Sequence, residues 1–161
     1  MDELKLYPDV VRWLRNYLKD RHSHSEIQAF DTHKINLSQF IFEQNLHKHF
    51  PEYSAFDIKV DITATIKSKT RMQLAFVECK VKPITLKDVG QILGYSKVAK
   101  PIYAFIISPE GISAPLSTLL LTYGRYDLLE YLEGKKVKIA NWNLTRKEID
   151  SASFLPPGEY S

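Results

Sequence analysis

The chain has 161 residues, 44% of them hydrophobic and 25% charged, which is ordinary for a single globular domain with a buried core. Its one cysteine excludes an internal disulfide, a structural zinc finger and a cysteine-bound iron–sulfur cluster. The formal net charge of +3 allows a nucleic-acid partner without requiring one. No apolar run reaches the roughly 18 residues of a membrane helix, and the N-terminus lacks a signal-peptide pattern. We therefore expect a cytoplasmic protein with no membrane partner.

The N-terminal third is expected to hold one helix followed by an insert. Apolar residues at helical spacing predict a helix over residues 8–20, with Pro8 in its first turn. Residues 21–50 are interpreted as the insert, which begins with a loop over 21–25. A short strand over 26–31 and a second helix from residue 36 or 38 to 49, stopped by Pro51, complete it.

Two paired strands are expected next. Apolar and polar residues alternate from Phe56 to Ile66, as in a half-buried strand, and a polar turn spans Lys67–Thr70. A second strand is predicted over Met72–Lys80. Because the turn between the two strands is short, they should pair antiparallel.

The C-terminal half predicts a helix over 85–100, a strand over 102–108 buried on both faces, and a helix over 116–132 interrupted near Gly124. A last strand is expected over 135–141, and the tail from residue 145 is expected to be loosely held. The single domain, with its core at about 55–141, is therefore of the α/β class, with a mixed central sheet flanked by helices.

Candidate chemistry lies at the end of the second strand. Glu78 and Lys80 are two residues apart, so both side chains project from one face, and burying them is costly unless they pair or bind something. Asp61 on the partner strand is expected to converge with them. Two carboxylates that hold Mg²⁺ or Mn²⁺, and a lysine that positions water or stabilises charge, suit phosphodiester cleavage. The backbone carbonyl of Cys79 is a further candidate metal ligand.

The set Asp61…Glu78-Cys79-Lys80 resembles the D…(D/E)-x-K signature of the PD-(D/E)XK nuclease superfamily, over about residues 55–108. The resemblance implies a restriction-endonuclease-like fold. Its core is a helix, a three-stranded antiparallel stretch, a helix and a further strand. It also implies a Mg²⁺- or Mn²⁺-dependent nuclease that cuts nucleic acid, here expected to be DNA.

A second motif, Gln91 and Tyr95, resembles the Q-x-x-x-Y element of RecB-like exonucleases, and the two residues share one helix face. The resemblance implies that Gln91 orients the lysine or the nucleic-acid end and that Tyr95 contacts the backbone. Two departures exist. Val60 stands where the signature has proline, and Asp57 stands where RecB-like members often have glycine.

Accessory residues are also expected. Glu43 is a candidate for the metal-binding acid that many superfamily members place on an early helix. Basic residues near the motif and at the expected turn are candidates for a rim of phosphate contacts around the site: Lys59, Lys67, Lys69, Arg71, Lys82, Lys87, Lys97 and Lys100.

Three alternatives remain open. The first is a dimeric endonuclease like the Holliday-junction resolvases, which share the superfamily core. The second is a non-catalytic nucleic-acid-binding module of the same fold. In the third, Glu78 and Lys80 form only a surface salt bridge, worth at most about 1 kcal/mol, and Asp61 lies far from them.

Overall fold

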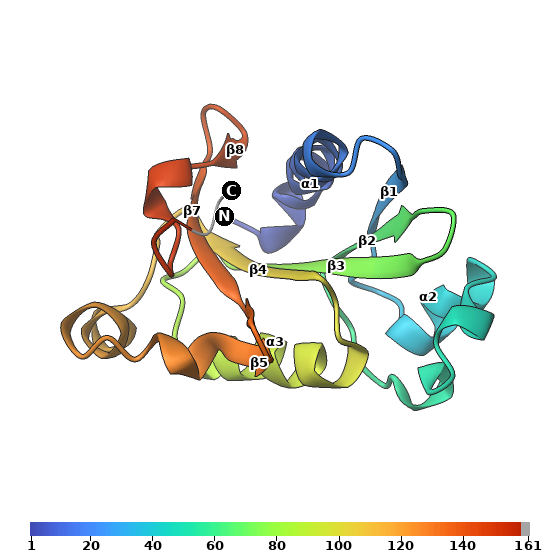
Figure 1. The fold of residues 1–161 in the computed structure, drawn as a ribbon. Coiled ribbons are helices and arrows are strands. Elements are labelled where there is room, and N and C mark those ends of the chain that lie inside the picture. The colour runs from blue at the N-terminus through green and yellow to red at the C-terminus, as the bar shows by residue number, and fades with distance from the viewer. Residues whose placement is uncertain (159–161) are drawn as a thin grey trace.

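The computed structural model describes residues 1–158, and its main feature is a curled six-stranded mixed sheet with helices on both faces (Figure 1). In spatial order the strands are β1 (Glu26–Asp31), β2 (Ile62–Lys67), β3 (Met72–Cys79), β4 (Tyr103–Ser108), β7 (Lys138–Asn143) and β8 (Glu148–Ile149). A separate hairpin consists of β5 (Glu130–Leu132) and β6 (Lys135–Lys136). The predicted α/β class and the mixed sheet flanked by helices are confirmed.

The helices are α1 (Tyr7–Arg21), α2 (Leu37–Glu43), α3 (Leu86–Ala99) and α4 (Ala114–Ser117). Shorter helical turns span Glu3–Lys5, His47–His49, Tyr53–Ala55, Thr118–Thr122, Tyr126–Leu129 and Ser151–Ser153. In Figure 1, α1 covers one face of the sheet and α3 the other. No helix in the described part of the chain is long and apolar enough to cross a membrane.

Strand direction brings several strand ends to one edge of the sheet. Strand β2 pairs antiparallel with both β1 and β3, whereas β4 pairs parallel with both β3 and β7. The carboxyl ends of the parallel strands therefore lie at the same edge, where open α/β sheets place their ligand sites. Helix α3 makes the crossover from β3 to β4.

The two faces of β3 belong to different cores. Leu74 and Phe76 face the core of α2 and α3, while the alternating positions from Ala75 to Cys79 face the core of α1. Glu78 follows on the α3 face and is only 6% exposed. The alternation thus buries a carboxylate in an apolar layer.

The predicted helices over 8–20 and 85–100 are confirmed as α1 and α3. A capping box starts α3, because the Asp88 N–H donates to the Thr85 hydroxyl and the Thr85 N–H donates to the Asp88 carboxylate. This box fixes Asp88 at the first turn of α3.

The strand predicted over Phe56–Ile66 is wrong in its first half, since β2 begins only at Ile62. The backbone of residues 56–60 bonds instead to the start of α2, where the Leu37 N–H donates to the Ile58 carbonyl. Buried Phe56 and Val60 pack into the core on that side. An alternating pattern therefore marks a packed loop here.

Two predicted helices are also wrong in extent. The one expected to reach residue 49 ends at Glu43, and Asn45 then adopts a left-handed conformation (φ 59°). The one predicted over 116–132 is interrupted at Gly124 (φ 63°) as expected, but its last residues form β5 of the hairpin instead of helix.

The tail expected to be loose from residue 145 is instead packed as far as the described residues extend. Strand β8 pairs with β7, and Leu155 exchanges backbone hydrogen bonds with Ile139. Phe154 is 2% exposed and lies edge-on to Phe105 at a ring distance of 6.2 Å. Apolar residues in this tail are few and irregularly spaced, so periodicity does not reveal them.

Replacing Phe154 with alanine should destabilise the protein by about 3–5 kcal/mol, because the truncation leaves a cavity in the α1-side core. Urea denaturation followed by circular dichroism measures the loss. Phe42→Ala is the matched control, since this side chain is 59% exposed, and it should cost about 1 kcal/mol or less. Equal losses in the two variants would contradict the packed tail.

Candidate active site

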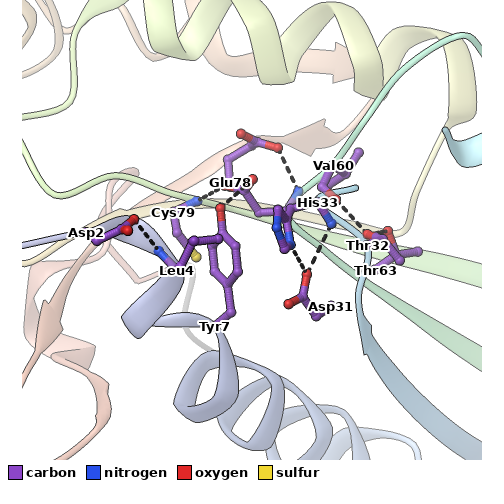
Figure 2. A network of polar contacts seen from close by, with 11 residues as sticks. Asp2, Leu4, Tyr7, Asp31, Thr32, His33, Val60, Thr63, Glu78 and Cys79 are labelled. Atoms are coloured by element: carbon purple, nitrogen blue, oxygen red, sulfur yellow. Dashed lines mark hydrogen bonds and ion pairs between the residues drawn. The ribbon is translucent and has the colours of Figure 1, made fainter. Parts of the chain in front are cut away.

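Two carboxylates meet where β2 begins and β3 ends. Ile62 pairs with Val77, so Asp61 lies across from Glu78 on neighbouring strands. The Asp61 N–H donates to Glu78 Oε1 at 3.1 Å, and the Cys79 N–H donates to Asp61 Oδ2 at 2.9 Å. Each carboxylate is thus held by the backbone of the other strand (Figure 2). Asp61 and Glu78 converge as predicted, and the alternative in which Asp61 lies far from Glu78 is wrong.

Tyr7 ties this pair to the helical layer. Its hydroxyl, at the start of α1, donates to Asp61 Oδ1 at 3.0 Å. Burial and the Asp61 charge raise the pKa of Tyr7, so the phenol remains a donor. Both Asp61 oxygens therefore accept hydrogen bonds. Glu78 Oε2 receives no hydrogen bond from any described residue, and this leaves one carboxylate oxygen free for a ligand.

The carboxyl pair is destabilised in its fully charged form. Burial raises the pKa of Asp61, although bonds from Cys79 and Tyr7 oppose the shift. Burial and the neighbouring Asp61 charge raise the pKa of Glu78 to about 8. No ion pair joins either carboxylate to a cation among residues 1–158. At neutral pH the pair therefore needs a proton or a bound cation.

Lys80 lies just past the end of β3, with its Nζ 3.7 Å from Asp88 Oδ1. Burial lowers the pKa of Lys80, but the carboxylates of Asp88, Glu3, Glu78 and Asp61 outweigh it and raise the pKa overall. Lys80 is consequently an ammonium ion at neutral pH, suited to stabilising negative charge rather than accepting a proton. Its contact with Asp88 also links it to the first turn of α3.

Sequence analysis missed a histidine beside the carboxylates. His33 follows β1, and its Nδ1 and backbone N–H both contact Asp31 Oδ1. Its ring centroid lies 5.0 Å from that of Tyr7, and its charge lowers the pKa of Asp61. An Asp-x-His sequence directly after a predicted strand was the available signal.

Glu3 and Asp88 were also missed. Glu3 lies in the helical turn before α1, where burial raises its pKa and the charges of Lys80 and Asp61 reach it. Nothing in the sequence places that turn beside β3. Asp88 is recognisable as a capping residue, but its contact with Lys80 depends on how α3 packs.

The other predicted site residues lie outside this network. Gln91 donates to the Tyr95 hydroxyl at 2.8 Å on α3, and neither side chain contacts Asp61, Glu78 or Lys80 through a hydrogen bond or ion pair. Glu43 is exposed at the end of α2 and accepts from Gln39. Lys82 and Lys97 are exposed.

The expected basic rim around the site is wrong for three of its members. Lys67, Lys69 and Arg71 lie at the β2–β3 turn, the end of β3 opposite to Glu78. The Cys79 thiol packs in the α1-side core, and burial raises its pKa, so only the backbone of Cys79 belongs to the site.

Comparison of the chain with protein-family models, with curated proteins and with solved structures finds no match.

The carboxylate pair has the oxygen ligands that a divalent cation needs. Within residues 1–158, no cluster of three or more His, Cys, Asp or Glu side chains is arranged to hold a metal ion. Mg²⁺ needs only one or two carboxylates and keeps several waters. The Asp61–Glu78 pair, with its free Glu78 oxygen, provides that minimum, and a cation there would neutralise the buried charge. The residues therefore fit Mg²⁺ or Mn²⁺.

Without divalent ions, the protein should lose stability as the pH rises from about 5 to 9, by a few kcal/mol at most. The pKa of Glu78 rises from its ordinary value of 4.5 to about 8 in the folded protein, so the folded protein holds a proton that the unfolded chain has lost. The stabilisation is complete below the unfolded pKa and is lost as the pH passes the folded one.

Urea denaturation in EDTA across this range measures the slope. Glu78→Gln should flatten the slope and stabilise the protein at high pH, whereas Glu43→Gln, on an exposed carboxylate, should leave it as in the native protein. An identical slope in the native protein and Glu78→Gln would show that Glu78 is not protonated at neutral pH.

Proposed function

We propose that the chain is a Mg²⁺- or Mn²⁺-dependent nuclease of the PD-(D/E)XK type that hydrolyses phosphodiester bonds in DNA. The observation that carries the proposal is the pair of half-buried Asp61 and buried Glu78, joined by reciprocal backbone hydrogen bonds, with Lys80 at the same strand end. A surface salt bridge between Glu78 and Lys80 does not describe this arrangement, because Lys80 pairs with Asp88 and Glu78 is buried.

The order of elements supports the restriction-endonuclease-like part of the proposal. Helix α1, the antiparallel strands β1–β2–β3, α3 and β4 follow the order that the superfamily resemblance implies. The insert lies between β1 and β2, over residues 32–61, and not before the first strand. Strand β1 is thus the third antiparallel strand, which was expected to be part of the insert.

Each residue of the site has a separate proposed role. Asp61 and Glu78, with the Cys79 carbonyl, would hold the cation, which supplies Lewis-acid activation of the phosphoryl group and a more acidic water. Tyr7 fixes the orientation of Asp61. Lys80 stays protonated and stabilises the charge that develops on the phosphate in the transition state. Exposed Gln91 and half-buried Tyr95 on α3 remain candidates for positioning the nucleic acid.

His33 is proposed as the proton-transfer residue. Asp31 contacts Nδ1 and orients the ring, so that Nε2 is left to accept or donate a proton. Lys80, with its raised pKa, is a poor base by comparison.

The test of the nuclease proposal is cleavage of labelled linear and circular DNA with Mg²⁺, Mn²⁺ or EDTA. Glu78→Gln and Lys80→Met should each slow metal-dependent cleavage by at least about 100-fold, because the first removes a proposed ligand of the cation and the second removes the charge that stabilises the phosphate in the transition state. Glu43→Gln is the matched carboxylate control and should cleave like the native protein.

Cutting of linear DNA alone would identify an exonuclease, and cutting of circles an endonuclease. Cleavage confined to four-way junctions, by a protein with the mass of a dimer, would favour the resolvase-like alternative. Metal-insensitive DNA binding with no cleavage of DNA, RNA or junctions would leave the binding module and contradict the nuclease.

His33→Ala should lower kcat by about 100-fold or more and remove one limb of the pH–rate profile, because general acid–base catalysis contributes that much. Binding of Mn²⁺ should be unchanged, since His33 is not among the proposed ligands. His24→Ala, in the exposed turn before β1, is the matched control. A slower enzyme with an unaltered pH profile would show that His33 only supports the structure.

A further inference from the structure

A second concave site lies at the end of the sheet opposite to the carboxylate pair. It encloses about 410 Å³, between the β2–β3 turn, the edge strand β1 with its neighbour β2, and the segment that follows α2. The strands contribute Glu26, Gln28, Thr65, Lys67 and Met72 to its lining, and the turn contributes Ser68, Lys69, Thr70 and Arg71. The segment after α2 contributes Gln44, Asn45, Leu46, Lys48 and His49. We call it the basic pocket.

The charge of the basic pocket is strongly positive. Lys48, Lys67, Lys69 and Arg71 face a single carboxylate, Glu26. This excess equals the net charge of the whole chain, which is +3. None of the four cations forms an ion pair with a carboxylate of the described residues, although Glu26 and Lys67 are partners in the β1–β2 register. Their mutual repulsion is therefore relieved only by water, salt or a bound anion.

The remaining lining supplies hydrogen-bond donors. Hydroxyls come from Thr65, Ser68 and Thr70, and side-chain amides from Gln28, Gln44 and Asn45. Two local features shape the backbone that carries part of this lining. The β2–β3 turn is closed by the bond from the Ser68 N–H to the Arg71 carbonyl, at 3.0 Å, and Asn45 adopts a left-handed conformation. Cations and neutral donors gathered around one concavity suit an oxyanion with several acceptor oxygens.

The basic pocket is separate from the carboxylate site. Met72 and Glu78 lie six residues apart on one extended strand, which corresponds to about 20 Å at ~3.3 Å per residue. At that separation salt screens the carboxylate charges, since the Debye length is about 8 Å at physiological ionic strength. An anion in the basic pocket is consequently not repelled by Asp61 and Glu78.

We propose that the basic pocket binds phosphoryl groups, either those of a free phosphorylated small molecule or those of a nucleic-acid backbone. Its volume lies within the range of small-molecule sites, about 300–1,000 Å³. No Phe, Tyr or Trp is among its lining residues in the described part of the chain, so the pocket recognises phosphate oxygens rather than stacked bases. The proposal stands whether or not the carboxylate site is a nuclease.

The test measures binding of three probes to the full chain carrying Glu78→Gln, so that cleavage cannot interfere. The probes are pyrophosphate, a fluorescent 20-nucleotide DNA strand and poly-glutamate, each titrated over a range of salt concentrations. The charge-removing variant is Lys67→Gln/Arg71→Gln. Its matched control is Lys19→Gln/Lys147→Gln, which removes two exposed lysines that lie outside the pocket. Circular dichroism checks that both variants are folded.

The pocket variant should weaken phosphate binding at least about tenfold, while the control stays within about twofold. For the DNA strand, the salt dependence of log K should also fall by roughly 1.4, because each phosphate contact contributes about 0.7 on single strands. Amide NMR shifts with pyrophosphate should be largest at residues 44–49 and 67–72.

Loss of pyrophosphate binding alone identifies a small-molecule ligand, and loss of strand binding identifies a nucleic-acid backbone. Equal weakening in both variants, equal binding of poly-glutamate, or no binding of either phosphate probe overturns the proposal.

Discussion

The structure depends on the cost of holding two carboxylates together in a buried place. An unpaired charge in an apolar layer is highly unfavourable, and Asp61 and Glu78 sit at adjacent strand ends with Glu78 almost fully buried. Three donors offset part of that cost: the N–H groups of Asp61 and Cys79 and the Tyr7 hydroxyl. These hydrogen bonds do not neutralise the charge. The remaining cost of the charged form raises the pKa of both carboxyl groups. Carboxyl groups with pKa values shifted by burial and by a neighbouring charge tend to cluster at functional sites.

The same network connects the layers of the fold. Tyr7 brings α1 to the start of β2, and Asp88 brings the first turn of α3 to Lys80. His33 enters from the residues that follow β1, so three antiparallel strands and two helices each contribute a side chain. A shift of either helix against the sheet would therefore change the electrostatics of the carboxylate pair. We infer that the geometry of the site is set by packing on both faces of the sheet.

The sequence predicted the two carboxylates and the lysine of the site, but not the side chains that surround them. Asp61, Glu78 and Lys80 lie on two strands joined by a short turn, so local pairing was enough to bring the carboxylates together. Tyr7, Glu3 and His33 reach them only through the packing of α1 and the course of the insert, which no local pattern encodes. Phe56–Val60 alternate like a strand, yet their backbone bonds to α2, because alternation reports burial and not hydrogen-bond partners. The lysines of the β2–β3 turn are close to Glu78 in sequence but are separated from it by the length of β3.

If the carboxylate pair binds a divalent cation, Mn²⁺ binding should release protons, and their number can be measured. Titration calorimetry near pH 7, in buffers of different ionisation enthalpy, gives this number. Because the pKa of Glu78 is about 8 without metal, we expect release of roughly one proton per ion, falling toward zero near pH 9. In Glu78→Gln the proton release should vanish and the affinity should fall. Mn²⁺ binding that is absent, or that is identical in the native protein and Glu78→Gln, would show that the carboxylate pair is not a divalent-cation site.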